Sequence, residues 1–364
     1  MAKDAKRVKD AKEKARSARR ATARKAAFKT FTKTVKRAEK VVAKAARAAA
    51  GAAQRSAPVR QAAAAVARRV DAFADGGFPI GKDTRLVVQG ITGHQGQFHT
   101  RQMLAFGTKV VAGVTPGKAG EKVEGVPVFD SVADAVEGTR ANASVVYVPA
   151  RFAKDAVLEA LDAGIRDVVV ITEHIPFHDA MDFVWYARLK GARVLGPNCP
   201  GMAAPGARCK IGILPNKIFR PGRVGVASRS GTLTYEIVNA LSERGVGQSG
   251  VLGLGGDPVN GTNFLDALKV FEADESTDAI VLVGEIGGTA EEEAAAYVKR
   301  HVKKPVFTYI AGRAAPEGKR MGHAGAIVSR GMGTAQSKVD AFRKAGAFVA
   351  DFPTDIADAI ARKG

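Results

Sequence analysis

Two residues of the carboxyl-terminal half have the chemical types needed for group transfer. His323 stands between small residues, and a neutral imidazole can attack a phosphoryl centre. A carboxylate on the other ring nitrogen would fix the tautomer and stabilise the positive charge that develops. Glu285 follows an apolar run that ends at Val283, so it is the candidate for that carboxylate. A histidine taken alone more often packs or faces solvent, and the pair therefore needs support from other motifs.

A short polar turn earlier in the same half is suited to binding an anion. Ser230, Gly231 and Thr232 follow an apolar run and precede a helical pattern. Backbone N–H groups at a helix N-terminus attract phosphate, and nearby hydroxyls add further donors. The alternative is a plain capping role for Ser230 or Thr232, which is compatible with phosphate binding. We predict a phosphate site at this turn.

A glycine-rich turn follows the first apolar run of the chain. Residues 90–96 read Gly-Ile-Thr-Gly-His-Gln-Gly and lead into a helical pattern, an arrangement that lets the backbone approach a diphosphate. The spacing is not G-x-G-x-x-G, and a tight turn without a ligand is the alternative. The next strand pattern is followed by Lys118, where an NAD-binding domain usually has an acid. A lysine suits a ribose phosphate, as in coenzyme A or NADP, unless it is only a solvated surface residue.

The other five histidines and the two cysteines show no Cys/His cluster, so no metal site is expected. Two cysteines cannot build a disulfide framework, which favours a reducing compartment. No stretch approaches the roughly 18 consecutive apolar residues that cross a bilayer, and no secretory signal is expected. We predict a protein that is not bound to a membrane.

Short β-branched runs alternate with amphipathic stretches from residue 85 onward. Regular alternation of this kind predicts parallel sheets covered by helices on both faces. Two α/β domains follow, over residues 76–203 and 204–364, with Pro and Gly frequent near their join. The predicted strands are 86–88, 109–114, 143–148, 167–171 and 192–195 in the first domain and 223–227, 250–254, 279–283, 305–310 and 347–352 in the second.

Residues 1–75 form a basic extension rich in Ala, Lys and Arg. Residues 1–70 hold 22 Lys and Arg against 4 Asp and Glu, which is +18 of the chain's net charge of +20. With few large apolar side chains to bury, the segment is expected to be partly helical or disordered. A tail without a specific partner, weak polyanion binding by residues 1–70, and a transit peptide are the three alternatives. Transit peptides avoid acids, and residues 1–70 contain four.

Nine ordered blocks make residues 80–360 resemble the α subunit of succinyl-CoA synthetase, also called succinate–CoA ligase. They are residues 89–96, 113–118, 171–173, 196–201, 209–213, 228–235, 256–258, 284–293 and 322–325. The resemblance implies an N-terminal Rossmann-like CoA-binding domain followed by a flavodoxin-like, doubly wound ligase domain. The usual subunit of this family lacks the basic extension.

The resemblance also implies roles for individual residues. His323 matches the phosphorylated histidine, Glu285 the carboxylate that orients it, and Tyr235 the contact to the organic acid. Asn198 and Cys199 lie in a block that lines the CoA region. The implied CoA-binding residues are Thr92, Gly93, His94, Gln95, Lys118, Ile171, Thr172 and Glu173.

In this family, phosphate attacks succinyl-CoA to give succinyl phosphate, and the histidine takes the phosphoryl group. A β subunit then passes that group to ADP or GDP, and it binds Mg with ATP or GTP in the reverse direction. The resemblance therefore implies a β partner, in an αβ or α2β2 assembly of the citric acid cycle, without which the chain is inactive. The implied location is the bacterial cytoplasm, or the mitochondrial matrix if the extension is a transit peptide.

Three rival functions stay open at this level. Malate–CoA ligase, or another acyl-CoA ligase of the same superfamily, shares these blocks. An NADP-binding Rossmann protein would explain the glycine loop and Lys118, but it leaves Glu285 and His323 without a task. A polyanion binder that has kept an enzyme core would explain the extension.

Overall fold

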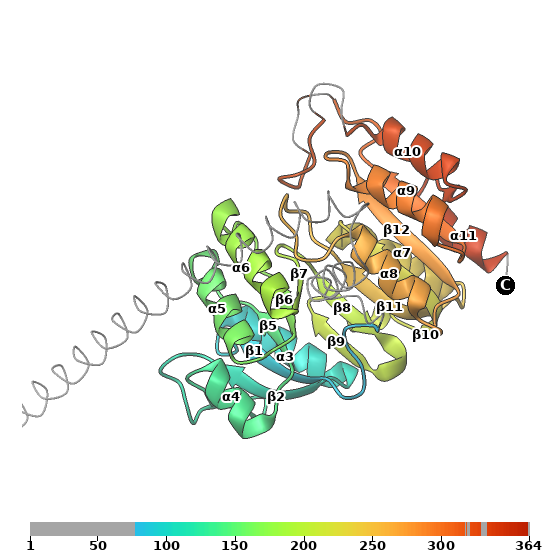
Figure 1. The fold of residues 1–364 in the computed structure, drawn as a ribbon. Helices are drawn as coiled ribbons and strands as arrows, with labels where there is room; N and C mark the ends of the chain where they lie inside the picture. The colour runs from blue at the N-terminus through green and yellow to red at the C-terminus, as the bar shows by residue number, and fades with distance from the viewer. Residues whose placement is uncertain (1–76, 317, 319–320, 329–332, 363–364) are drawn as a thin grey trace, which may run out of the picture. The chain divides into compact units, whose positions relative to one another are not determined.

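The computed structural model describes residues 77–316, 318, 321–328 and 333–362. The predicted basic extension, residues 1–75, and its polyanion site lie outside the described residues. The described part contains two seven-stranded sheets with helices on both faces, as Figure 1 shows. The predicted doubly wound α/β fold is confirmed.

The first sheet is formed from the amino-terminal half of the described chain. Its neighbouring strands are parallel except for the β3–β4 pair, in the order β3-β4-β2-β1-β5-β6-β7. Its strands are β1 (Arg85–Gln89), β2 (Lys109–Val114), β3 (Lys122–Val123), β4 (Val126–Phe129), β5 (Ala143–Val146), β6 (Asp167–Val170) and β7 (Arg193–Leu195). The chain proceeds from β1 to β2 on one side and returns to β5 on the other. Ligands of open α/β sheets bind outside the carboxyl ends of strands at such a reversal.

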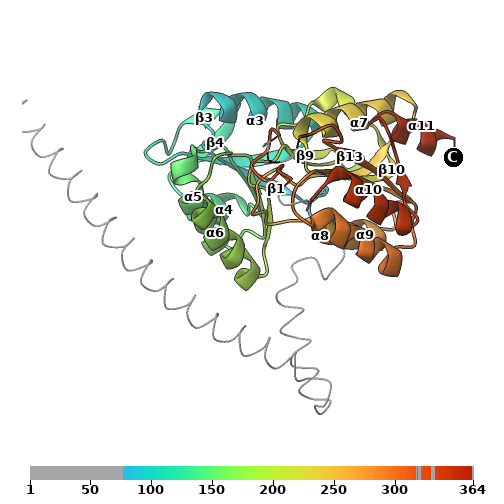
Figure 2. The same cartoon turned by 90° about the horizontal axis from the view of Figure 1, so that it is seen from above.

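Helices cover both faces of this sheet because its strands are apolar on both sides. Val87 of β1 belongs to the apolar cluster under one face, whereas Leu86 and Val88 belong to the cluster under the other. Figure 2 shows α3 on the side opposite to α4, α5 and α6. The helices are α3 (His94–Phe106), α4 (Val132–Thr139), α5 (Ala150–Asp162) and α6 (Phe177–Lys190).

The second sheet is mixed, with the order β14-β13-β12-β10-β11-β8-β9. Its strands are β8 (Gly201–Ala204), β9 (Cys209–Gly212), β10 (Pro221–Ser228), β11 (Gln248–Gly253), β12 (Ala279–Glu285), β13 (Val306–Ala311) and β14 (Phe348–Val349). Strands β11, β10, β12, β13 and β14 pair in parallel, but β8 is antiparallel to both β11 and β9. A short 3-10 turn, η2 (Pro205–Ala207), joins β8 to β9, and η3 (Asn216–Ile218) precedes β10.

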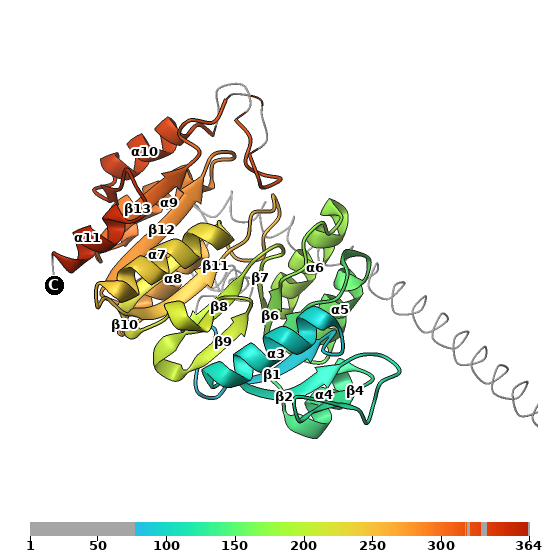
Figure 3. The ribbon, with the colours of Figure 1, turned by 180° about the vertical axis from the view of Figure 1, so that it is seen from behind.

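The β8–β9 hairpin was missed by the sequence analysis, which began the second series of strands at residue 223. Its strands contain Gly, Ala, Met, Cys and Lys with a single β-branched residue, so they lack a strand pattern. The hairpin packs against α3, as Figure 3 shows, and Thr108 exchanges two hydrogen bonds with the backbone of Lys210, at 2.8 and 2.9 Å. The hairpin therefore attaches the second sheet to the first.

Five helices flank the second sheet. Figure 2 shows α7 and α11 on one side of it and α8, α9 and α10 on the other. They are α7 (Gly231–Glu243), α8 (Phe264–Ala273), α9 (Ala290–His301), α10 (Ala335–Lys344) and α11 (Asp355–Ala361). Within residues 77–362, none of the described helices has the length and apolarity to cross a bilayer.

One apolar cluster continues from the first sheet into the second. It contains Leu86 of β1, Met202 of β8, Ile211 of β9 and Phe271 of α8, all at most 2% exposed. Phe271 stacks on Phe78, with ring centroids 6.0 Å apart and an interplanar angle of 28°. The shared core fixes the two sheets within one compact unit, so residues from both can form one site.

Phe271→Ala is expected to lower the free energy of unfolding by about 3–5 kcal/mol, because a fully buried aromatic ring leaves a cavity. Chemical denaturation followed by far-UV circular dichroism measures the loss. Phe352→Ala is the matched control, since that ring is 68% exposed and its removal should change stability by less than about 0.5 kcal/mol. Equal losses in the two variants would contradict the shared core.

Candidate active site

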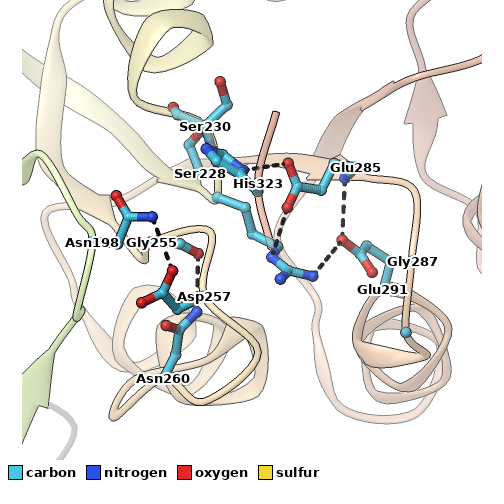
Figure 4. A network of polar contacts seen from close by, with 12 residues as sticks. Asn198, Ser228, Ser230, Gly255, Asp257, Asn260, Glu285, Gly287, Glu291 and His323 are labelled. Carbon is cyan, nitrogen blue, oxygen red and sulfur yellow. Dashed lines mark hydrogen bonds and ion pairs between the residues drawn. The ribbon is translucent and has the colours of Figure 1, made fainter. Parts of the chain in front are cut away.

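His323 and Glu285 meet at the centre of the second half, as the sequence analysis predicted. Nδ1 of His323 lies 2.7 Å from Oε2 of Glu285, and Figure 4 shows the two side chains pointing at each other. Glu285 is the last residue of β12, where the carboxyl end of a parallel strand presents side chains for binding. A carboxylate only accepts, so Nδ1–H donates, and Nε2 is the ring nitrogen left for chemistry.

The pKa of His323 is raised above its ordinary value. The hydrogen bond to Glu285 is the main cause, and the charges of Glu285 and Asp257 act in the same direction. Burial and the positive charge of Arg229 act against it. Asp257 is itself held by Asn198, whose Nδ2 donates to its Oδ1 at 2.9 Å. Arg229 and Asp257 were not predicted as site residues.

The imidazole of His323 is held in place by backbone on two sides. A Cβ added to Gly256 would lie 2.2 Å from Cγ of the imidazole, so only glycine allows the ring this position. On the other side the chain turns tightly, because the backbone N–H of Ala326 donates to the carbonyl of His323 at 3.1 Å and that of Met321 donates to Ala326 at 2.9 Å. These contacts restrict the ring to the direction of Glu285.

The predicted phosphate turn begins helix α7 beside His323. The side chain of Ser230 is the N-cap and accepts from the backbone N–H of Leu233 at 3.3 Å. Ser228 fixes the turn, since its Oγ accepts from the N–H of Ser230 at 3.1 Å and donates to the carbonyl of Ser230 at 2.8 Å. Capping and anion binding are compatible here, because a helix N-terminus offers several N–H groups.

A cavity of about 700 Å³ connects this site to the loops of the first sheet. Nine of the predicted site residues line it, and they come from both halves of the described chain. They are Gln95, Ile171, Thr172, Glu173, Ser230, Gly231, Thr232, Tyr235 and His323. The structure thus brings most of the predicted binding residues to one cavity.

Four of the predicted CoA-binding residues do not line the cavity. Thr92, Gly93 and His94 lie in the turn between β1 and α3, next to Gln95, which does line it. Lys118 is half-exposed and pairs with Glu121 at 2.8 Å. The roles of these four residues in ligand binding stay predictions.

Two aromatic residues of the cavity wall were missed by the sequence analysis. His99 of α3 stacks on Tyr147, which follows β5, with ring centroids 5.6 Å apart and an interplanar angle of 8°. Burial lowers the pKa of His99 to about 4, with help from the charge of Lys210, so its ring is neutral near neutral pH. No sequence signal separated His99 from the other histidines, because its position depends on how α3 packs.

Cys199 and Tyr147 give the cavity a wall of buried, protonated groups. Burial raises the pKa of the Cys199 thiol to about 12, and the thiol donates to the carbonyl of Val170 at 3.3 Å. Burial also raises the pKa of Tyr147. Such a thiol is a poor nucleophile, so Cys199 contributes to the wall of the cavity and not to its chemistry. Among the described residues, no group of three His, Cys, Asp or Glu side chains is placed to hold a metal ion.

Two protein families match successive parts of the chain. Residues 81–174 match the CoA binding domain, and residues 227–348 match the CoA-ligase family. An Archaeoglobus fulgidus protein named succinate–CoA ligase (ADP-forming) subunit alpha 2 is 56% identical over 282 residues, which cover 78% of this chain and 98% of that protein. An Aquifex aeolicus protein named succinate–CoA ligase (ADP-forming) subunit alpha is 54% identical over 285 residues, or 78% and 93% of the two chains.

Solved structures of larger chains share the fold. ATP citrate lyase of Methanosaeta concilii, in complex with (3S)-citryl-CoA, has a TM-score of 0.73 at 28% identity. The match covers 79% of this chain but only about half, 51%, of that one. The dinucleotide forming acetyl-coenzyme A synthetase 1 of Ca. Korarchaeum cryptofilum is alike in fold, with a TM-score of 0.63 at 23% identity over 76% of this chain and 60% of its own.

The two matched domains and the cavity between them, with a histidine paired to a carboxylate, define a CoA-ligase chain. Identity above 50% extends over almost the full length of the curated relatives. The chain belongs to the family of succinate–CoA ligase alpha subunits.

Glu285→Gln is expected to lower the pKa of His323, because the carboxylate is the main cause of its raised value. The carboxylate charge stabilises the protonated ring. Without that charge, the ring loses its proton at a lower pH than in the wild type. An NMR titration of the His323 Cε1–H signal measures the midpoint. Glu243→Gln, at the far end of α7, is the control and should leave the midpoint unchanged. A midpoint in Glu285→Gln equal to or above that of the wild type would refute the pairing.

Proposed function

We propose that this chain is the α subunit of a succinate–CoA ligase and that His323 carries the phosphoryl group during turnover. The observation that carries this proposal is the 2.7 Å hydrogen bond between Nδ1 of His323 and Glu285. With Nδ1 engaged and the ring lining the cavity, Nε2 is available as the nucleophile. Glu285 stabilises the positive charge that the ring acquires when Nε2 becomes bonded to phosphorus.

Ser230, Gly231 and Thr232 are the proposed phosphate site. They line the same cavity as His323, and the N-terminus of α7 offers N–H groups for an anion. Phosphate held there attacks the thioester carbonyl of succinyl-CoA, and the resulting succinyl phosphate then gives up its phosphoryl group to His323. Tyr235, one turn into α7 and half-buried in the cavity wall, is the proposed contact to the organic acid.

Coenzyme A is the proposed occupant of the rest of the cavity. The glycine turn after β1 and the segment Ile171–Glu173 after β6 lie at the carboxyl end of the first sheet, where open α/β sheets bind nucleotides. The cavity runs from these loops to His323, so a long ligand anchored at Gln95 can bring its thiol to the reacting group. Thr92, Gly93, His94 and Lys118 complete the proposed set through the turn itself and the ribose phosphate.

The proposed partner is a β subunit that exchanges the phosphoryl group with ADP and binds Mg with the nucleotide. The relatives named as alpha subunits of an ADP-forming ligase support this division of labour. Domains over residues 76–203 and 204–364 remain our proposed boundaries. Weak polyanion binding by residues 1–70 and a cytoplasmic location are the finer proposals, and the first depends on charge alone.

The chain, combined with its β subunit and incubated with labelled ATP and magnesium, is expected to acquire a label that is acid-labile and base-stable. His323→Asn is expected to abolish the label, because no other group takes over the attack. His301→Asn is the control, since His301 ends α9 and packs on Tyr297 away from the cavity. A label that survives in His323→Asn would show that the phosphoryl group is carried elsewhere.

Assayed with succinate and with malate, the same pair is expected to form the succinyl thioester faster. Malate carries one more hydroxyl, and a pocket rejects a substrate that merely adds a hydroxyl only weakly, so a preference of about 10–100-fold is expected. The rate at which the CoA thiol is consumed, followed in a coupled assay, gives kcat/KM for each acid. A higher kcat/KM for malate would assign the chain to the rival acyl-CoA ligase. Binding of NADP in place of CoA by calorimetry would contradict both.

A further inference from the structure

Buried charges of alternating sign run from His323 into the interior of the second half. Oε1 of Glu285 lies 3.5 Å from Nε of Arg229, and Nη1 of Arg229 lies 3.7 Å from Oε1 of Glu291. Oε2 of Glu291 is hydrogen-bonded to Nζ of Lys338. Figure 4 shows Glu285 between His323 and Glu291 at the start of this chain of charges. The proposed nucleophile is thereby connected to helix α10.

The far end of this chain of charges is completely buried. Lys338 and Glu291 have no exposed side-chain surface, and Lys338 also donates to the carbonyls of Gly287 at 3.0 Å and Gly288 at 3.2 Å. Burying an ion pair costs several kcal/mol per ion in desolvation, and an apolar pair would stabilise the fold as well. Stability alone therefore does not explain these charges, which suggests a role in the site.

Glu291 fixes Glu285 through the backbone. Oε1 of Glu291 accepts from the N–H of Glu285 at 3.1 Å. A Cβ on Gly284 would lie 2.6 Å from Cγ of Glu291, so the side chain of Glu291 crosses directly over this glycine. Nη1 of Arg229 forms an ion pair with the same Oε1 of Glu291. The three groups hold the end of β12, and with it the carboxylate that faces His323.

Arg229 approaches Glu285 without forming a hydrogen bond to it. Oε1 of Glu285 and Nε of Arg229 are both buried and lack a hydrogen-bond partner among the described residues. Their 3.5 Å separation is an ion pair that leaves Oε2 of Glu285 directed at His323. Arg229 therefore acts on Glu285 through its charge, at the oxygen that the imidazole does not use.

The charged groups that face His323 come from three strands. Glu285 ends β12, Arg229 follows β10, and Asp257 follows β11. The two carboxylates favour the protonated imidazole, which has no lone pair on Nε2, whereas Arg229 opposes them. The positive charge of Arg229 limits how strongly the carboxylate that orients the nucleophile also favours its protonated form.

We propose that Arg229, supported by Glu291 and Lys338, is a positioning residue that aims Glu285 at Nδ1 while opposing protonation of the His323 imidazole. This inference rests on the proposed function. In the step it serves, the lone pair of Nε2 attacks phosphorus and the bond from phosphorus to the acyl oxygen breaks. The organic carboxylate leaves with that electron pair, and the Nδ1 proton stays on the ring, donated to Glu285.

The first test measures His323 directly and needs no turnover. Arg229→Met is expected to raise the midpoint of the His323 NMR titration by about one pH unit, because a positive charge close to the imidazole is lost. Arg229→Lys keeps the charge and should restore most of the wild-type midpoint. Lys304→Met is the control, since Lys304 donates to the carbonyls of Phe271 and Asp274 and does not contact this chain of charges. An unchanged or lowered midpoint in Arg229→Met overturns the proposal.

The second test uses the complex with the β subunit and labelled ATP. Arg229→Met is expected to slow labelling of His323 about tenfold, with a larger loss at low pH than at high pH, because more of the imidazole is protonated. A loss that is the same at every pH would indicate a structural role only and overturn the proposal. If the wild type takes up no label, the proposed function fails, whereas the NMR titration still decides the role of Arg229.

The third test addresses Lys338, whose loss alone removes the cation that is paired with Oε2 of the buried Glu291. Lys338→Met is expected to slow labelling about tenfold, because Glu291 then competes with Glu285 for Arg229. The double variant Lys338→Met with Glu291→Gln removes both buried charges, and it is expected to recover at least half of that loss. It also guards against a single variant that fails to fold. A double variant that is as slow as, or slower than, Lys338→Met would contradict support through charge.

Discussion

The hydrogen bond between His323 and Glu285 joins residues 38 positions apart in the chain, and much of the second half serves to form it. Glu285 must stand at the carboxyl end of β12, so the strand has to be central and paired on both sides, as it is with β10 and β13. The imidazole must reach that end from a loop beyond β13. It does so by lying against the bare backbone of Gly256, where any side chain would occupy the space of the ring.

A carboxylate beside a histidine both orients and charges it, and these two effects oppose each other in a nucleophile. The pKa of His323 is raised because the hydrogen bond to Glu285 has a larger effect than burial. Arg229 lies 3.5 Å from the far oxygen of Glu285, which lets it oppose the charge without taking the hydrogen bond. The buried pair of Glu291 and Lys338 then prevents Arg229 from moving freely. The cost of burying these charges is consistent with a site in which the orientation of Glu285 and the charge around His323 must be controlled together.

The sequence allowed prediction of the fold class and of most central strands, because parallel strands buried on both faces are continuous β-branched runs. Strand β2 has the predicted bounds, residues 109–114. The β8–β9 hairpin escaped because its strands are poor in such residues and gain their stability from packing on α3. The pairing of His323 with Glu285 could be inferred from residue types and from the family resemblance. Glu291 could not, since it begins a run of three glutamates and only the helix register shows which one turns inward.

The position of the cavity follows from the direction of the two sheets. Segments after β1, β5 and β6 of the first sheet line it together with the start of α7, which follows β10 of the second. Parallel sheets bind ligands at the carboxyl ends of their strands, so each half contributes its own binding edge to one space. A reaction between a thiol and an activated acid needs both reactants held in contact, which lowers its entropic barrier. The β8–β9 hairpin is hydrogen-bonded to Thr108 and packed on α3, and it thereby holds the two binding edges next to each other. The part of the chain with the weakest sequence pattern is therefore the part that makes two ordinary α/β halves into one site.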